Sequence, residues 1–156
     1  MLTWLEMSGN TSHTMEQRIT LITLGVKNLQ RSRDFYQKVL GWQPLESSTE
    51  SIVFFQLNGI QLALFPQESL ADDAGVPADG KGFRGFSLAH NLGSEKEVDE
   101  LVAALEEKGA RVLKQPEKVF WGGYSSYIAD PDDNLWEIAY NPFLPLDNSQ
   151  KTSSIH

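Results

Sequence analysis

The chain repeats one pattern twice, and this repetition constrains its fold more than any other feature. Each copy reads as a strand, an amphipathic helix and then closely spaced strands, over Ile19 to Phe65 and over Gly85 to Tyr140. The last strands of the two copies can be aligned, and Ala63 then corresponds to Glu137. A chain of 156 residues has the length of one compact unit built from two halves. We therefore expect two related modules, of which only the second carries a carboxylate in its last strand.

The first copy has the signals of a complete module. Residues 19–26 are rich in β-branched residues and leucine, which predicts a strand covered on both faces. A helix is predicted from Leu29 to about Leu40. Its buried stripe consists of Leu29, Ser32, Phe35, Tyr36, Val39 and Leu40. Ser51 to Leu57 and Gln61 to Phe65 flank Asn58-Gly59, which predicts a β-hairpin.

The second copy has the same order of elements. Phe86 to Asn91 is typical of a strand, and Ser94 to Glu97 forms a capping box at the start of a helix. Three further strands are predicted at Arg111 to Leu113, Gly123 to Ala129 and Leu135 to Tyr140. Asp130 to Asn134 is the tight turn between the last two. The segment between the two copies contains prolines and glycines, which indicates a linker.

These boundaries predict five consecutive segments. We expect residues 1–17 to be a disordered N-terminal segment, 18–66 the first module, 67–84 the linker, 85–142 the second module and 143–156 a tail.

Composition excludes several classes of function. The formal net charge is −8, and the lysines and arginines are scattered, so the chain lacks the cationic surface that nucleic acids require. No apolar run approaches the roughly 20 residues of a membrane span, and no secretory signal is visible, so we expect a cytoplasmic protein. The absence of cysteine excludes disulfides and thiolate metal ligands.

Several short motifs occur in a fixed order along the repeated region. They are Leu24-Gly25-Val26, Asn28-Leu29, Ser32, Phe35-Tyr36, Leu40-Gly41, Trp121-Gly122, and Asp130-Pro131-Asp132 with Asn134 and Glu137. Together they resemble the vicinal oxygen chelate superfamily of glyoxalase I, bleomycin-resistance proteins and extradiol dioxygenases. The resemblance implies an α+β fold in which two βαβββ modules pair into a curved, mostly antiparallel sheet around a cavity, with helices on the outside. The modules can pair within one chain or between chains, and we expect a homodimer.

The resemblance also assigns positions for metal ligands. In metal-using members, four inward side chains, two from each module, hold a divalent ion. Those positions fall on Leu21, Ala63, Phe86 and Glu137. Only Glu137 can donate a lone pair to a metal, and the neighbouring residues provide no strong ligand. We therefore expect no metal and no other cofactor.

Glu137 and His90 are the candidate catalytic residues. A glutamate in an apolar strand must be solvated by a cavity, paired or protonated, so Glu137 is either functional or structural. His90 lies four positions after Phe86, which places it on the same inward face, although a histidine at a strand end more often binds backbone or water. His13 and His156 lie in the terminal segments and are not expected to function.

Other residues are candidates for lining the cavity. Trp121, Tyr124 and Tyr127 come close together in the sequence, and strand alternation places at least one of the two tyrosines inside. Aromatic residues in strands more often pack in a core than bind ligands. The candidate ligand-binding residues are Leu21, Thr23, Gln56, Ala63, Phe86, Leu88, Trp121, Tyr124 and Tyr127.

Three functions remain open. The first is a metal-independent protein that binds a small organic molecule in an apolar cavity, as the bleomycin-resistance branch implies. The second is a glyoxalase-like isomerase or lyase, with Glu137 as the base and His90 or a tyrosine as the proton partner. The third is a non-catalytic interaction scaffold, which a shallow cavity filled by Leu21, Phe86 and Trp121 would favour.

Overall fold

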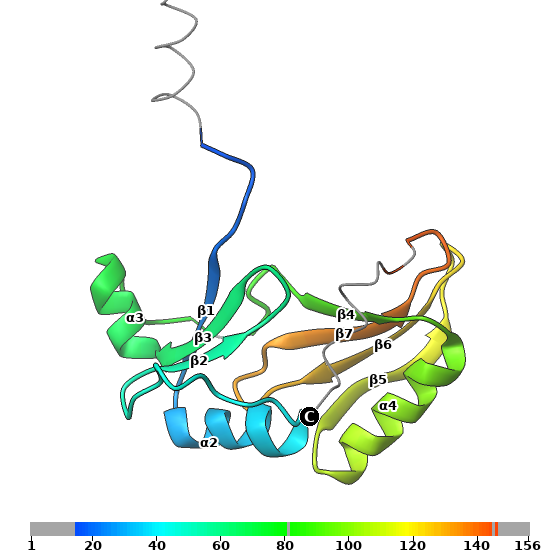
Figure 1. Cartoon of the computed structure of the whole chain (residues 1–156), viewed down its shortest axis with the longest axis horizontal. Helices are drawn as coiled ribbons and strands as arrows, with labels where there is room; N and C mark the ends of the chain where they lie inside the picture. Colours follow the sequence, from blue (N-terminus) through cyan, green and yellow to red (C-terminus); the bar gives the residue numbers. More distant parts are fainter. Residues whose placement is uncertain (1–14, 81, 145, 147–156) are drawn as a thin grey trace, which may run out of the picture.

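The computed structural model describes residues 15–80, 82–144 and 146, and it has a mixed α+β fold with two sheets (Figure 1). The predicted fold class is confirmed. His13 and His156 lie outside the described residues, as do most of the predicted N-terminal segment and most of the predicted tail. None of the helices in the described part of the chain is long and apolar enough to cross a membrane.

The first sheet has three strands. They are β1 (Leu21–Val26), β2 (Val53–Gln56) and β3 (Gln61–Pro66), in the order β1-β3-β2. β1 runs parallel to β3, and β2 pairs with β3 in the antiparallel hairpin that Asn58-Gly59 predicted. The parallel pair requires a crossover between β1 and the hairpin, and a helix provides it.

The second sheet has four strands. They are β4 (Leu88–Leu92), β5 (Arg111–Lys118), β6 (Tyr124–Ala129) and β7 (Leu135–Tyr140), in the order β4-β7-β6-β5. β4 runs parallel to β7, and the other two pairs are antiparallel. In both sheets, therefore, the first strand lies at one edge and pairs with the last strand.

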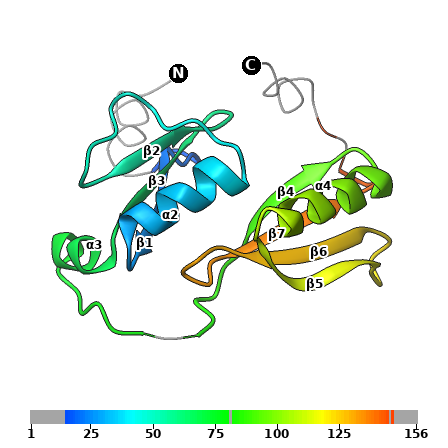
Figure 2. The ribbon, with the colours of Figure 1, turned by 90° about the horizontal axis from the view of Figure 1, so that it is seen from below.

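Each sheet is covered by one crossover helix. α2 (Leu29–Asp34) continues as the π-helical segment η1 (Phe35–Val39), and α4 (Glu95–Glu107) crosses the second sheet (Figure 2). The Asn28 side chain caps α2, and the Ser94 hydroxyl accepts the backbone N–H of Glu97, as the capping box predicted. Both helices lie on the same side of the molecule.

The core joins the two modules of one chain. Trp42 and Tyr36 from the first module contact Trp136 of the second, with ring centroids 5.6 Å and 6.1 Å apart. The same cluster contains Phe55 from β2 and Leu105 from α4. Aromatic pairs at these separations add attraction to the apolar area that they bury. The two modules therefore pack against each other within a single chain.

A third helix, α3 (Gln67–Ala74), forms inside the segment predicted as a linker. It packs on the face of the first sheet opposite to α2, because a Cβ on Gly25 would lie 3.3 Å from Gln67 Cα and 3.3 Å from Leu70 Cδ2. Glycine at position 25 permits this close approach of helix and strand. The crossover helices α2 and α4 are those that the fold class predicts, and α3 is an additional helix with no buried residue.

Candidate functional site

Strand alternation divides the predicted site residues between two faces. Leu24, Leu64 and Ile138 lie in the core beside α2 or α4, so residues of opposite alternation face away from these helices. We call the face opposite to α2 and α4 the inner face. Among the predicted residues it carries Leu21, Thr23, Gln56, Ala63, Tyr127 and Glu137.

Glu137 lies in the middle of β7 on the inner face and is partly buried. Its Oε2 accepts a hydrogen bond of 2.6 Å from Ser125 Oγ on β6. This distance is typical of a hydroxyl that donates to a charged oxygen. Tyr127 is the direct cross-strand neighbour of Glu137. The second module thus has one inward carboxylate, with a bound serine hydroxyl and a tyrosine on the adjacent strand.

The predicted pair of Glu137 and His90 is not formed. His90 is in register with Ile138, whereas Glu137 is in register with Ala89, so the two side chains project from opposite faces. The prediction counted alternation from Phe86, which precedes β4, and alternation does not hold outside the strand. His90 lies on the edge strand and is exposed. Its imidazole is still partly shielded from solvent, and this desolvation lowers its pKa.

Leu88 and Tyr124, which were predicted to contact a ligand, face α4 instead. Leu88 is in register with Trp136 and packs against the core. The Tyr124 hydroxyl donates a hydrogen bond of 2.7 Å to Asp99 Oδ1 on α4, and this bond raises the pKa of Tyr124 to about 12. Tyr127 is therefore the tyrosine that alternation places inside.

Trp121 and Gln56 lie apart from the cavity described next. Trp121 lies in the turn before β6, where its ring occupies the space beside Gly123. The six residues of β6, about 20 Å of strand, separate Trp121 from the end of the second module that borders the cavity. The Gln56 side chain donates to two backbone carbonyls of its own hairpin and accepts a hydrogen bond from Gln61.

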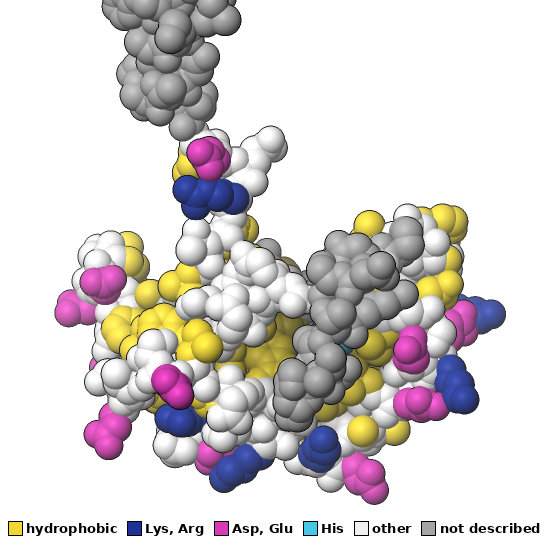
Figure 3. Space-filling view, in the orientation of Figure 1, with side chains coloured by type: hydrophobic (Ala, Val, Ile, Leu, Met, Phe, Trp, Pro, Cys, Tyr) yellow, Lys and Arg dark blue, Asp and Glu magenta, His cyan; other side chains and the backbone are white. Residues whose placement is uncertain are grey.

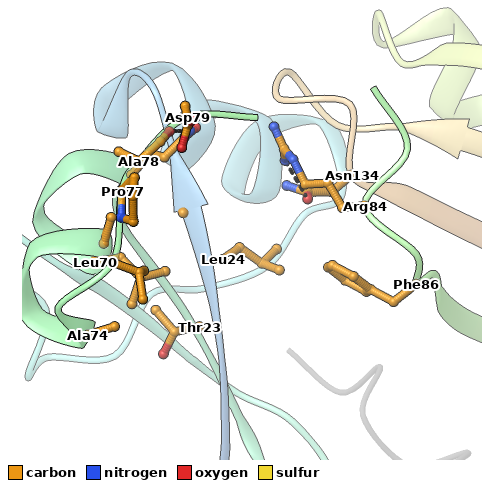
Figure 4. Close-up of a pocket in the computed structure, with 14 residues that line it drawn as sticks. Thr23, Leu24, Leu70, Ala74, Pro77, Ala78, Asp79, Arg84, Phe86 and Asn134 are labelled. Carbon is orange, nitrogen blue, oxygen red and sulfur yellow. Dashed lines mark hydrogen bonds between the residues drawn. The ribbon is translucent and has the colours of Figure 1, made fainter. Parts of the chain in front are cut away.

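A cavity of about 340 Å³ lies between the first sheet, α3 and the start of the second module (Figure 4). Thr23 and Phe86, two of the predicted residues, line it. Most of the other lining residues are apolar, among them Leu24, Leu70, Ala74, Val76 and Pro77. Its polar lining includes Arg84, Asn134 and Asp79. The cavity therefore combines apolar walls with a few polar groups, which is usual for small-molecule sites.

The turn from Asp130 to Asn134 holds Arg84 at the edge of this cavity. Arg84 Nη1 donates to Asp132 O and to Asn134 Oδ1, both at 3.3 Å. Asn134 is buried, and its Nδ2 donates to Asp130 Oδ2 at 2.8 Å. Asp130 Oδ2 also accepts the Tyr36 hydroxyl at 2.7 Å. Burial and the nearby charge of Asp130 raise the pKa of Tyr36 well above its ordinary value.

The same turn connects the second module to α2. The Asp132 carboxylate, which has no exposed surface, accepts hydrogen bonds from Ser32 Oγ at 2.8 Å and from the backbone N–H of Lys27 at 2.9 Å. Arg31 Nη2 donates to the same carboxylate at 3.1 Å. We call this set of contacts the inter-module network, and its members are Lys27, Arg31, Ser32, Tyr36, Asp130 and Asp132.

Comparison with known proteins assigns this arrangement to a family. The model of the Glyoxalase/Bleomycin resistance protein/Dioxygenase superfamily matches residues 18–138. The chain belongs to this superfamily. It is similar to a glyoxalase-related enzyme from Fulvimarina pelagi, with 36% identity and a TM-score of 0.76 over 86% of this chain and 95% of that one. A lactoylglutathione lyase from Agrobacterium tumefaciens shares the fold at 24% identity, with a TM-score of 0.65 over 85% of this chain and 100% of that one.

The residues at the four positions that the resemblance assigns to metal ligands do not fit a divalent ion. Leu21, Ala63 and Phe86 have no lone pair to donate, and Ser87, the neighbour of Phe86, offers only a neutral hydroxyl. Glu137 alone provides a carboxylate. The described residues contain no group of three or more His, Asp or Glu side chains placed to hold an ion.

Arg84 and α3 form much of the cavity, and neither was predicted from the sequence. Arg84 was assigned to the end of the linker, where its role depends on a turn 50 residues later. The sequence does indicate a helix here, because Leu70, Ala71 and Ala74 recur at helical spacing and a glycine follows them. In the structure this residue, Gly75, ends α3 with a φ of 74°.

Proposed function

We propose that this protein binds a small organic molecule, without a divalent metal, in the cavity between its two modules. The observation that carries the proposal is the cavity itself, with its volume of about 340 Å³ and a lining that is mostly apolar. This volume falls within the range of about 300–1,000 Å³ that small-molecule sites occupy. Thr23 on the inner face and Phe86 at the start of the second module both line it, so the ligand contacts both modules.

The position of α3 supports a binding site at this place. The helix covers part of the inner face of β1, and Leu70 and Ala74 line the cavity from the helix side. The inner face is where the superfamily resemblance places the ligand. The similarity to a glyoxalase-related enzyme also favours a small organic molecule as the ligand.

A thermal-shift screen with a metabolite and antibiotic library tests this proposal. A ligand present at about 100 times its Kd should stabilise the protein by about 2.7 kcal/mol, which corresponds to roughly 5–10 °C in a chain of this size. Ala74→Phe fills the cavity and should abolish the shift. Ala103→Phe is the matched control, because Ala103 is an exposed helical alanine that does not line the cavity. Ligands that stabilise both variants equally would contradict the proposed site.

The same assay tests the metal-independent part of the proposal. We expect Ni²⁺, Zn²⁺, Mn²⁺ and Fe²⁺ to leave the melting temperature unchanged, because Glu137 is the single carboxylate at the four ligand positions. Strong stabilisation by one of these ions, lost in Glu137→Gln, would show that a metal site exists.

The enzymatic alternative rests on one observation, the adjacency of Glu137 and Tyr127 on the inner face. In a glyoxalase-like isomerase or lyase, Glu137 would be the base and Tyr127 the proton partner, in place of His90. This alternative predicts turnover of a hemithioacetal substrate that falls at least 100-fold in Glu137→Gln. Turnover that survives this substitution would exclude Glu137 as the base.

The proposal includes a homodimer, a cytoplasmic location and no binding to nucleic acid. On the face shown in Figure 3, Lys and Arg side chains lie among Asp and Glu side chains. A face of mixed charge, on a chain whose net charge is −8, does not attract polyphosphate.

The scaffold alternative predicts a shallow cavity filled by Leu21, Phe86 and Trp121. It has less support, because neither Leu21 nor Trp121 lines the cavity.

A further inference from the structure

We infer that the ligand of the inter-module cavity is an organic monocarboxylate whose carboxylate is bound by the guanidinium of Arg84. The inference rests on the proposed function and adds the chemical class of the ligand. It follows from the bonds that Arg84 makes, from the residues that fix it, and from the walls of the cavity beside it.

The guanidinium of Arg84 has donors to spare. Its Nη1 donates to two neutral oxygens, Asp132 O and Asn134 Oδ1, both at 3.3 Å. No hydrogen bond within the described part of the chain uses its Nε or its Nη2, and Arg84 takes part in none of the ion pairs there. Guanidinium presents its donors in a planar fork that matches a carboxylate.

Buried groups fix the position of Arg84. Asn134 Oδ1 faces the guanidinium because Asn134 Nδ2 is held by Asp130 Oδ2 at 2.8 Å. The backbone N–H of Asn134 also donates to Asp130 Oδ1 at 2.8 Å. A donor that is held in place before binding loses less conformational entropy when it binds. Asn134 is thus a positioning residue for Arg84.

The cavity walls select an apolar body for the acid. Figure 4 shows Phe86 and Leu24 beside Arg84, with Leu70 and Ala74 of α3 on the opposite side of the cavity. A ligand with its charge at Arg84 would therefore place its other end against apolar side chains. An aromatic or branched acid of modest size fits such a site better than a sugar or a polyol.

The local charge favours a monoanion over a phosphate dianion. Asp79 is the one carboxylate among the residues that line the cavity, and it forms no ion pair with Arg84. Asp130 and Asp132 belong to the turn that holds Arg84, and their carboxylates accept hydrogen bonds from residues of the first module. Arg84 is the one cation among the residues that line the cavity, so it balances one negative charge there, and a second charge on the ligand would meet the carboxylate of Asp79 without a partner.

Matched acid and amide pairs test the inference by calorimetric titration of the full chain. The probes are 3-phenylpropanoate with 3-phenylpropanamide, and isovalerate with isovaleramide, with phenyl phosphate as the dianion. Each acid should bind at least about tenfold more tightly than its amide. This preference should disappear in Arg84→Gln, weaken in Arg84→Lys and persist in Arg33→Gln, since Arg33 does not line the cavity. Phe86→Ala should weaken acid and amide alike.

Each outcome has one meaning. Equal binding of acid and amide, both lost in Ala74→Phe, would overturn the inference and leave the proposed function standing. Tighter binding of phenyl phosphate than of the acids would overturn the monocarboxylate and retain an anion site. If neither member of any pair binds the wild type, the inference fails. The proposed function is then tested by the uncharged compounds of the thermal-shift library. Arg84→Gln also removes two hydrogen bonds, so a second measurement on the wild type tests the inference without that variant. The acid should bind more tightly than its amide at low salt, and this preference should be lost at high salt.

Discussion

Replacing Asp132 with asparagine should lower the free energy of unfolding by about 2–3 kcal/mol, because this carboxylate holds the two modules together. Its side chain is fully buried and accepts hydrogen bonds from Ser32, Lys27 and Arg31. Asparagine has almost the same shape, so the substitution changes the hydrogen bonding without opening a void. The experiment therefore measures the polar contribution of the inter-module network.

The magnitude follows from the individual bonds. A hydrogen bond to a charged group contributes about 1.5–3 kcal/mol and a neutral one about 0.5–1.5 kcal/mol. Asparagine keeps one acceptor oxygen for the Lys27 N–H, now without a charge, at a loss of about 1 kcal/mol, and it removes the acceptor of the Ser32 hydroxyl proton, at a loss of about 1–2 kcal/mol. The Arg31 contribution is smaller, because about half of that side chain is exposed.

Urea denaturation, followed by circular dichroism, measures this loss, and the melting temperature should fall by roughly 5–10 °C. Asp133→Asn is the matched control one residue away. Asp133 is exposed and pairs with Arg111 at the surface, and asparagine tolerates its φ of 65°. A loss in Asp132→Asn no larger than in Asp133→Asn would refute the reasoning. A double-mutant cycle with Ser32→Ala should give a coupling of about 1 kcal/mol.

Three further predictions concern single residues. Tyr36→Phe should lower the free energy of unfolding by about 1–3 kcal/mol at neutral pH, because Trp136 Nε1 loses its acceptor. The pKa of Tyr36 is raised in the folded state, so the stability of the wild type should fall as pH rises above about 10. The stability of the variant should fall less steeply when urea denaturation is repeated at alkaline pH. His90 has a lowered pKa in the folded state, so its contribution to stability should be lost as pH falls below about 6.5, and His90→Gln should flatten that dependence in denaturation series between pH 5 and 7.5. Gly123→Ala should displace the Trp121 ring and increase acrylamide quenching of tryptophan fluorescence. Unchanged quenching would show that the ring does not occupy the space beside residue 123.

Local signals predicted most of the secondary structure. The observed bounds of β7 equal the predicted Leu135 to Tyr140, and the Asn58-Gly59 hairpin forms as expected. These elements depend on residues close together in sequence, whose turn chemistry and alternation dictate the conformation. α3 was missed because the prolines and glycines around it are typical of a linker, although its Leu70, Ala71 and Ala74 stripe and Gly75 indicate a short helix.

Contacts between distant parts of the chain were harder to predict. The turn from Asp130 to Asn134 was predicted, but its carboxylates bind α2 and η1, about 100 residues earlier in the chain. One signal was available: Ser32 and Tyr36 place hydroxyl groups on the buried stripe of that helix, and buried hydroxyls require partners. Sequence alone could not identify which of the 21 acidic residues would provide them.

The alignment of Ala63 with Glu137 predicts a site on the inner face of the second module, yet the cavity lies at the boundary between the modules. α3 explains the difference, since it packs over Gly25 and closes part of the inner face of the first sheet. The cavity is then bounded by this helix on one side and by Arg84 and Phe86 on the other. Its charged groups are accordingly the guanidinium that the Asp130 to Asn134 turn fixes and the carboxylate of Asp79, while Glu137 remains bound to Ser125 on a separate part of the sheet. The duplicated pattern therefore predicts the scaffold, and the non-repeated segment between the copies forms much of the cavity in which we propose that a ligand binds.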